Sequence, residues 1–174
     1  LAESVAQVDR LAAMVNDVLR SGSVAEQALR QEKRLRVDQL IAEVVADYTL
    51  LAKTRGMTFT VDARPTTMRA NRDMMRHVIS NLVSNAVRHG DAGSVITITC
   101  DQHELAIENA CKPLTKQQLQ HVFDPFYRSN GDKKQHADSS GIGLYTVKML
   151  LDTKGLDYDF TPHGRGMRFV VRFA

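Results

Sequence analysis

The chain has 174 residues, of which 43% are hydrophobic, which is enough for one ordinary domain with a sizeable core and a short appendage. Its formal net charge is only +3, and basic and acidic residues are interspersed in both halves, so we expect no nucleic-acid partner. Neither Cys100 nor Cys111 belongs to a CxxC motif, which is typical of a reducing compartment and argues against structural zinc. We therefore expect a cytoplasmic protein.

No apolar run reaches the length of about eighteen residues that a membrane span requires, so we expect no membrane contact within these residues. The sequence opens at Leu1 without an initiator methionine or a signal peptide, and we expect a fragment whose parent carries any membrane anchor elsewhere.

The first twenty residues carry apolar side chains at alternating intervals of four and three. These are Leu1, Val5, Val8, Ala12, Val15 and Leu19. The spacing predicts a coiled-coil-like helix and favours a helix-pair or dimer contact over docking on its own domain. We expect Ser21, Gly22 and Ser23 to end this helix and the polar stretch up to Arg36 to be a linker. The predicted segments are a helix over 1–22, a linker over 23–34 and a globular domain over 35–174.

Helices and strands alternate irregularly in the globular part. In chain order we expect a helix capped by Asp38 and ended by Gly56, strands at 57–62 and 67–70, a helix over 72–89 stopped by Gly90 and Gly93, a hairpin around 96–100 and 105–107, a helix over 115–122, a polar loop at 129–140, a helix over 143–154 and two final strands. Hairpins at two places argue against a Rossmann array. The pattern predicts an α+β fold, a two-layer α/β sandwich with helices on one face of a mixed sheet.

The helix predicted over 72–89 has two chemically different faces when residues are placed about 100° apart. Its apolar face carries Met75, Ile79, Leu82, Val83 and Ala86, and its polar face carries His77, Asn81, Asn85, Arg88 and His89. Two amides one turn apart beside a cation suit Mg²⁺ next to a bound phosphate, because an amide oxygen can replace one water ligand. A solvated surface helix is the alternative interpretation of the same face.

A second motif, Gly141-Ile142-Gly143-Leu144, opens an apolar-periodic helix. Glycines at a helix N-terminus let backbone N–H groups approach an anion, and the helix dipole favours negative charge there, although a purely structural turn fits the same residues. The polar loop before it follows Phe123-Asp-Pro-Phe126-Tyr-Arg128, which combines aromatic anchors with a cation. A long polar loop inside a compact domain is typical of a functional segment.

In this order, the amide-bearing helix, the segment before the loop, the loop and the glycine motif resemble the ATP-binding catalytic domain of sensor histidine kinases. That domain shares the Bergerat (GHKL) fold with gyrase, MutL and heat-shock chaperone ATPases. The resemblance covers residues 35–174, and residues 1–20 are similar to the end of the second helix of the kinase dimerisation domain. It implies ATP and Mg²⁺ as cofactors, a response regulator as partner, and a homodimeric, membrane-anchored parent.

The resemblance also implies roles for residues on the helix over 72–89. Asn85 matches the Mg²⁺ ligand of the family, and Asn81 lies beside it on the same face. Arg88 takes the place of a lysine that meets the phosphates, and His89 takes the place of an aromatic residue that borders the nucleotide.

Further matches lie in the second half of the chain. Phe123 and Phe126 match the aromatic box that anchors a lid over the nucleotide, and Ser129–Ser140 match the lid. Arg128 matches a cation that contacts phosphate. The second glycine box of the family falls on Gly141, Ile142, Gly143 and Leu144.

The adenine-reading segment departs from the family pattern. Its Asp-x-Gly-x-Gly motif falls on Asn109-Ala110-Cys111-Lys112-Pro113, so an amide replaces the acid and both glycines are absent. The carbonyl oxygen of Asn109 can accept a hydrogen bond from the adenine amino group, but more weakly than a carboxylate. We therefore expect nucleotide binding with altered or reduced affinity.

The implied reaction is transfer of the γ-phosphate of Mg-ATP to a histidine outside this chain, with Asn81 and Arg128 as the catalytic residues. No histidine of this chain stands in the His-Glu box of the family, so we expect no autophosphorylation of the fragment. A GHKL-type ATP hydrolase is one alternative, but such enzymes carry a water-activating glutamate where this chain has Asn81, and an amide has no useful basicity. A nucleotide-impaired dimerising or docking module is the other.

Overall fold

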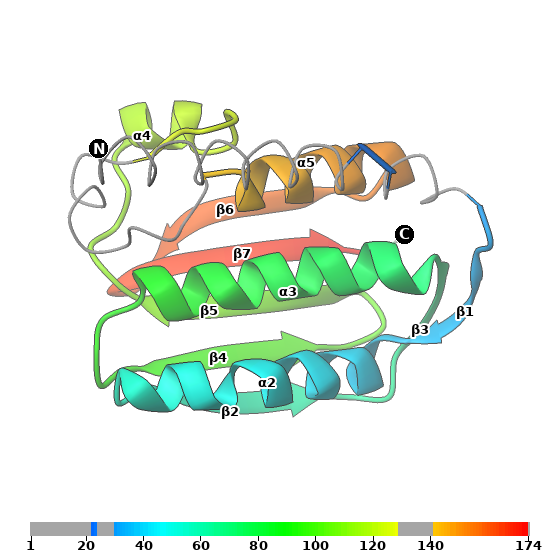
Figure 1. Cartoon of the computed structure of the whole chain (residues 1–174), viewed down its shortest axis with the longest axis horizontal. Helices are drawn as coiled ribbons and strands as arrows, with labels where there is room; N and C mark the ends of the chain where they lie inside the picture. The colour runs from blue at the N-terminus through cyan, green and yellow to red at the C-terminus, as the bar shows by residue number, and fades with distance from the viewer. Residues whose placement is uncertain (1–21, 24–29, 129–140, 174) are drawn as a thin grey trace, which may run out of the picture.

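The computed structural model describes residues 22–23, 30–128 and 141–173 (Figure 1). The helix predicted over residues 1–20 and the loop predicted over 129–140 lie outside the described residues. Within the described ranges, no helix combines the length and the apolar character needed to cross a membrane.

The main sheet has five strands among the described residues, in the order β2-β4-β5-β7-β6. Their bounds are Thr58–Ala63 for β2, Val95–Cys100 for β4, Glu104–Ala110 for β5, Tyr158–His163 for β6 and Gly166–Arg172 for β7. Strands β2 and β4 are parallel, and the other three neighbouring pairs are antiparallel. The sheet is therefore mixed, and β4–β5 and β6–β7 are the two predicted hairpins.

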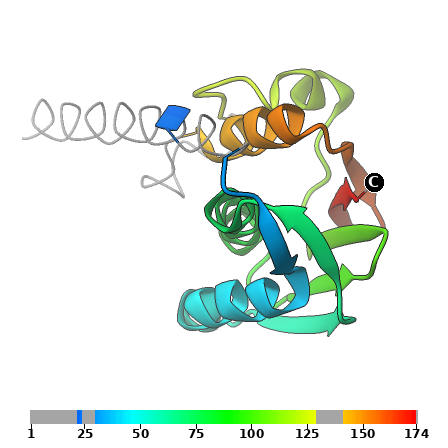
Figure 2. The same cartoon turned by 90° about the vertical axis from the view of Figure 1, so that its right-hand side faces the viewer.

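Three helices cover one face of this sheet: α2 (Val37–Thr54), α3 (Arg72–His89) and α5 (Gly143–Lys154). Figure 2 shows the helical layer and the sheet side by side, edge-on. The short helix α4 (Lys116–His121) lies near the start of α5, at the left of Figure 1. The predicted two-layer sandwich is confirmed.

The side of the sheet away from the helices carries ion pairs. Arg168 lies 3.1 Å from both Glu104 and Glu108, and Arg172 lies 2.7 Å from Asp159. These residues come from three neighbouring strands at alternate positions, so they share the face opposite the core residues Leu105, Ile107, Phe169 and Val171. The helices pack on the other face, where the core residues of β5 and β7 lie.

Helix α3 is the central element of the helical layer. Its apolar face is buried as predicted, through Met74, Met75, Val78, Ile79, Leu82, Val83, Ala86 and Val87. The side chain of Asn71 caps the helix by accepting a hydrogen bond from the N–H of Met74 at 3.0 Å. Because the apolar face is fixed in the core, the polar face of α3 is held outward.

Two expectations for the N-terminal part of the domain are wrong. Lys33–Arg36, expected within the linker, form strand β1, which pairs antiparallel with β3 (Thr67–Ala70). Three of its four residues are charged and exposed, and only Leu35 is buried, so the strand has almost no apolar pattern. In addition, Gly22 and Ser23, expected to end the first helix, are helical. Glycine is a weak helix breaker that context overrides.

Asp38 is not the N-cap of α2, because the helix begins one residue earlier, at Val37. Its carboxylate instead pairs with the guanidinium of Arg36 at 2.6 Å and accepts a hydrogen bond from the N–H of Thr66 at 3.0 Å. These contacts, the Arg36 guanidinium first, hold the pKa of Asp38 well below its usual range. Asp38 thus joins the start of α2 to the turn before β3.

Helix α2 ends in a Schellman motif at Gly56, the residue at which the sequence predicts its end. Gly56 has φ +65°, its N–H donates to the carbonyl of Lys53, and the N–H of Met57 donates to the carbonyl of Ala52. Met57 is buried, so the chain enters the sheet directly after the turn.

Candidate functional site

The polar face of α3 and the start of α5 lie next to each other. A Cβ placed on Gly143 would lie 3.6 Å from Oδ1 of Asn81, which is ordinary van der Waals contact. Asn81, Asn85, Arg88 and His89 are all partly exposed. The structure therefore brings together the amide face and the glycine-led helix, which the sequence places far apart.

The glycine turn before α5 also contacts the segment that follows α4. The N–H of Phe126 donates to the carbonyl of Gly141 at 3.1 Å. Gly141 has φ +74°, and a Cβ there would lie 3.0 Å from both Cα and the carbonyl carbon of Phe126. Glycine is needed at this position both for its backbone conformation and for the close approach. The two segments that flank residues 129–140 are thus joined.

The two predicted box aromatics differ in their surroundings. Phe123 packs edge-on against Tyr158 and Phe169, with ring centroids 5.7 and 6.2 Å apart, and so anchors the segment after α4 on strands β6 and β7. Phe126 is 49% exposed. We therefore assign Phe123 to packing and regard Phe126 as the aromatic ring of the pair that is open to a ligand.

The glycine motif divides in the same way between packing and access. Ile142 is 2% exposed, and Leu144 packs partly against the core. The two glycines that flank Ile142, Gly141 and Gly143, are partly exposed. The apolar residues fix the start of α5, and the glycines leave its backbone approachable. Arg128, on the other side of residues 129–140, is also partly exposed.

The end of α3 meets the end of β5. The N–H of Asp91 donates to the carbonyl of Ala110 at 2.7 Å, and the Nε of Arg88 donates to Oγ of Ser84 at 3.1 Å. Asn109 is 9% exposed at the end of β5. Arg88, His89 and the predicted adenine segment therefore belong to one end of the domain.

Burial raises the pKa of the Cys111 thiol, and a hydrogen bond with the Asn109 side chain opposes part of that rise. The thiol is therefore protonated at neutral pH and available as a weak hydrogen-bonding neighbour of Asn109. The neighbour of the Asn109 amide is therefore the sulfur of Cys111, at a position where the family motif has a glycine.

Gly166 is a residue of this region that sequence reasoning missed. A Cβ at Gly166 would lie 1.9 Å from the backbone oxygen of Asn109, which no side chain could tolerate. Gly166 therefore allows β7 to approach β5 at Asn109. Its signal in the sequence is a glycine within the region of the two predicted final strands, which indicates close backbone approach.

A divalent cation at this site could not rest on a cluster of carboxylates. Among the described residues, no three His, Cys, Asp or Glu side chains lie close enough together to hold a metal ion. The amide of Asn85 could supply one oxygen ligand, with phosphate oxygens supplying others, which is the common arrangement for Mg²⁺ in nucleotide sites. The residues present fit a cation that arrives with its nucleotide.

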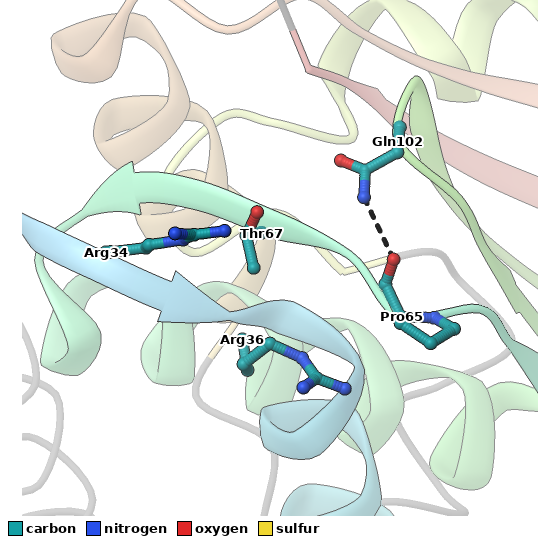
Figure 3. Close-up of a pocket in the computed structure, with 5 residues that line it drawn as sticks. All are labelled: Arg34, Arg36, Pro65, Thr67 and Gln102. Carbon is teal, nitrogen blue, oxygen red and sulfur yellow. Dashed lines mark hydrogen bonds between the residues drawn. The ribbon is translucent and has the colours of Figure 1, made fainter.

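A separate pocket lies at the other end of the domain, where the β1–β3 pair meets the β4–β5 turn (Figure 3). It is lined by Arg34, Arg36, Pro65, Thr67 and Gln102, and the Gln102 amide donates to the carbonyl of Pro65 at 2.9 Å. None of the predicted site residues lines this pocket.

The chain is similar to known proteins along most of its length. The sensor histidine protein kinase HK06 of Streptococcus pneumoniae is 32% identical over 98% of this chain and 38% of its own length. The chain thus spans well under half of the length of the curated relatives that it matches. The histidine kinase AdeS of Acinetobacter baumannii has the same fold, with a TM-score of 0.75 and 20% identity over 97% of this chain and 80% of that one.

A second solved structure is the histidine kinase ThkA in complex with the response regulator protein TrrA. It matches 96% of this chain and 48% of its own, with a TM-score of 0.71 and 19% identity. A family model described as histidine kinase-, DNA gyrase B-, and HSP90-like ATPase matches residues 70–174. The chain therefore belongs to this family of ATPases, whose fold implies ATP binding.

Proposed function

We propose that this chain is the kinase core of a two-component sensor, which binds Mg-ATP and transfers the γ-phosphate to a histidine outside the chain. The observation that carries the proposal is the proximity of the Asn81 amide to Gly143, where a Cβ would lie 3.6 Å from Oδ1 of Asn81. It unites an amide-bearing helix face, suited to a cation, with a glycine-opened helix start, suited to an anion. A solvated helix face would not need a glycine-opened helix beside it.

In the proposed complex, Asn85 holds Mg²⁺ through its amide oxygen, and the cation offsets charge on the phosphates. The backbone at Gly143 receives a phosphate at the positive end of the α5 dipole. Arg88 and Arg128 supply further positive charge. Phosphoryl transfer depends mainly on positioning and charge stabilisation, so these groups suffice without a protein base that activates water.

At the other end of the nucleotide, Asn109 accepts a hydrogen bond from the adenine amino group, and His89 borders the base. The amide oxygen of Asn109 carries no net charge, so a hydrogen bond to it lacks the charge assistance that a carboxylate provides. We therefore propose that adenine is held more weakly here than by a carboxylate.

The partners are proposed by similarity. ThkA is complexed with a response regulator in its solved structure, which supports relay from the phosphorylated histidine to an aspartate of such a protein. We assign residues 1–22 to the dimerisation helix of a homodimeric parent, the residues between this helix and strand β1 to a linker, and the residues from β1 onward to the catalytic domain. Strand β1 moves the start of the folded part to Lys33. The parent is a membrane-anchored sensor in this proposal, with the present chain in the cytoplasm.

The competing function is ATP hydrolysis. It requires a base that activates water, and the position in question is Asn81, whose amide cannot accept a proton at neutral pH. A docking module without nucleotide is the second competitor, favoured by the altered segment from Asn109 to Pro113.

Binding of a fluorescent ATP analogue, with and without Mg²⁺, tests the proposal. We expect Mg²⁺-dependent binding that Asn85→Ala weakens by about 1–3 kcal/mol, the scale of a lost polar contact to a charged group. Gln39→Ala is the matched control, because it removes an exposed amide from α2, away from the site. Thermal unfolding of both variants should match that of the parent chain, since the core lies on the opposite face of α3.

Absence of binding at millimolar Mg-ATP would contradict the kinase proposal and favour the docking module. Incubation with γ-labelled ATP separates the remaining alternatives. We expect label in neither the chain nor free phosphate, because the acceptor histidine is proposed to lie outside the chain. Rapid release of labelled phosphate would favour a hydrolase.

A further inference from the structure

We propose that Arg55, at the end of α2, is a positioning residue for the phosphate-binding end of α3. It acts by donating hydrogen bonds to main-chain carbonyls in the last turn of α3, including that of Arg88. This inference rests on the proposed function, because it takes Arg88 as a residue that meets the phosphates of ATP.

The position of Arg55 is fixed by the turn in which it lies. Arg55 is the C-cap of α2, its N–H donates to the carbonyl of Ala52 at 3.0 Å, and its own carbonyl accepts the N–H of Gly93 at 2.9 Å. The next residue, Gly56, has the left-handed conformation that closes the Schellman motif. The backbone of Arg55 is therefore bound on both sides before its side chain reaches α3.

The side chain of Arg55 satisfies carbonyls that the end of α3 leaves unpaired. A helix has no internal partners for its last four carbonyls, which in α3, with its C-cap at Gly90, are those of residues 87–90. The carbonyl of Ala86 accepts the N–H of Gly90 at 2.9 Å. Nη1 of Arg55 donates to the carbonyls of Val87 and Arg88, the latter at 2.9 Å. One guanidinium thus serves two of the four carbonyls.

A buried methionine reinforces the same junction. Gly90 follows α3, and a Cβ there would lie 2.5 Å from Cε of Met57. The methyl group of Met57 therefore occupies the space that a side chain at residue 90 would need. Arg55 and Met57, both from the turn between α2 and β2, therefore lie against the end of α3.

Arg88 is consequently held at two points. Its side-chain Nε donates to Oγ of Ser84 at 3.1 Å, and its carbonyl accepts from Arg55. A guanidinium must be placed within fractions of an ångström to bind phosphate well. The hydrogen bond from Arg55 to the carbonyl of Arg88 places the Arg55 guanidinium at the C-terminal end of α3, which is the negative end of the helix dipole. A bound polyphosphate would favour keeping both cations at this end.

The test compares ATP with adenosine, which lacks the phosphates. For Arg55→Met we expect ATP affinity, measured by calorimetry with Mg²⁺, to fall by about threefold to tenfold, in the usual range for coupling between contacting residues. Adenosine affinity should fall much less than ATP affinity, because Arg55 bonds the main chain of Arg88 rather than that of His89, which is proposed to border the base. Lys53→Met is the matched control, because it removes an exposed cation from the last turn of the same helix and should leave both affinities unchanged. Equal losses for ATP and adenosine, or equal losses in the two variants, would overturn the inference.

A double-mutant cycle with Arg88→Met tests the route of the effect. If Arg55 acts through Arg88, adding Arg55→Met to Arg88→Met should cause no further loss of ATP affinity. Fully additive losses would overturn the inference. Arg55→Lys, which retains a charged donor, should restore part of the affinity, and it carries the comparison if Arg55→Met does not fold. Failure of the unmutated chain to bind ATP would instead refute the proposed function, so the two failures are distinguishable.

Discussion

Replacing Gly141 by alanine tests whether the turn before α5 positions the site. At φ +74° an alanine costs about 1–2 kcal/mol relative to glycine. Its Cβ would also meet Cα and the carbonyl carbon of Phe126 at 3.0 Å and the carbonyl oxygen of Tyr127 at 3.2 Å. These atoms are backbone, so they yield only by moving the segment, and overpacking of this kind costs about 1–3 kcal/mol. Together the two effects amount to about 2–5 kcal/mol.

Gly155→Ala provides the matched control for backbone strain. Gly155 has φ +77°, and a Cβ there would meet nothing within 4 Å, so only the first cost of about 1–2 kcal/mol applies. Urea unfolding of the two variants therefore separates strain from contact. We further expect Gly141→Ala, but not Gly155→Ala, to weaken binding of Mg-ATP by at least about tenfold, because the displaced backbone flanks Gly143. Equal stability and equal affinity in the two variants would refute the reasoning.

Two other substitutions test single interactions. Asn109→Asp should strengthen binding of ATP relative to GTP, because a carboxylate accepts a hydrogen bond from the adenine amino group more strongly than an amide does. Competition between the two nucleotides measures this preference. An unchanged preference would show that the adenine segment is wrongly aligned. Asp38→Asn should lower the free energy of unfolding at pH 7 by about 1–2 kcal/mol through loss of the charged partner of Arg36 and Thr66. Because the pKa of Asp38 is depressed in the fold, its contribution is present above about pH 4 and fades below it. Unfolding curves at several pH values should therefore converge on acidification, and a constant gap would contradict this.

Much of the fold was predictable where one physical signal dominates. Helix α3 matches its predicted range, because its apolar residues recur at helical spacing and Asn71 and Gly90 delimit it. Strand β4 was predictable from strict alternation, in which Ile96, Ile98 and Cys100 are all buried. In both elements the local pattern and the tertiary burial agree, so sequence and structure carry the same information.

The elements that escaped prediction depend on partners distant in sequence. Strand β1 is charged and exists because it pairs with β3, and Asp38 leaves the cap position because Thr66 and Arg36 bind its carboxylate. The bond from Arg55 to the end of α3 likewise joins residues more than thirty positions apart. Neither hydropathy nor spacing encodes such contacts, since any exposed arginine has the same local pattern.

Under the proposed function, the chemistry of the site depends on Asn81. Its Oδ1 lies beside the start of α5, next to the proposed phosphate-binding backbone at Gly143, and the proposed cation ligand Asn85 follows one turn later on α3. An amide in that position can orient a group by hydrogen bonding but cannot remove a proton from water. The same geometry with a glutamate would support hydrolysis. Under the proposed function, Asn81 therefore does not activate water for attack on ATP, which favours transfer of the γ-phosphate to a histidine acceptor.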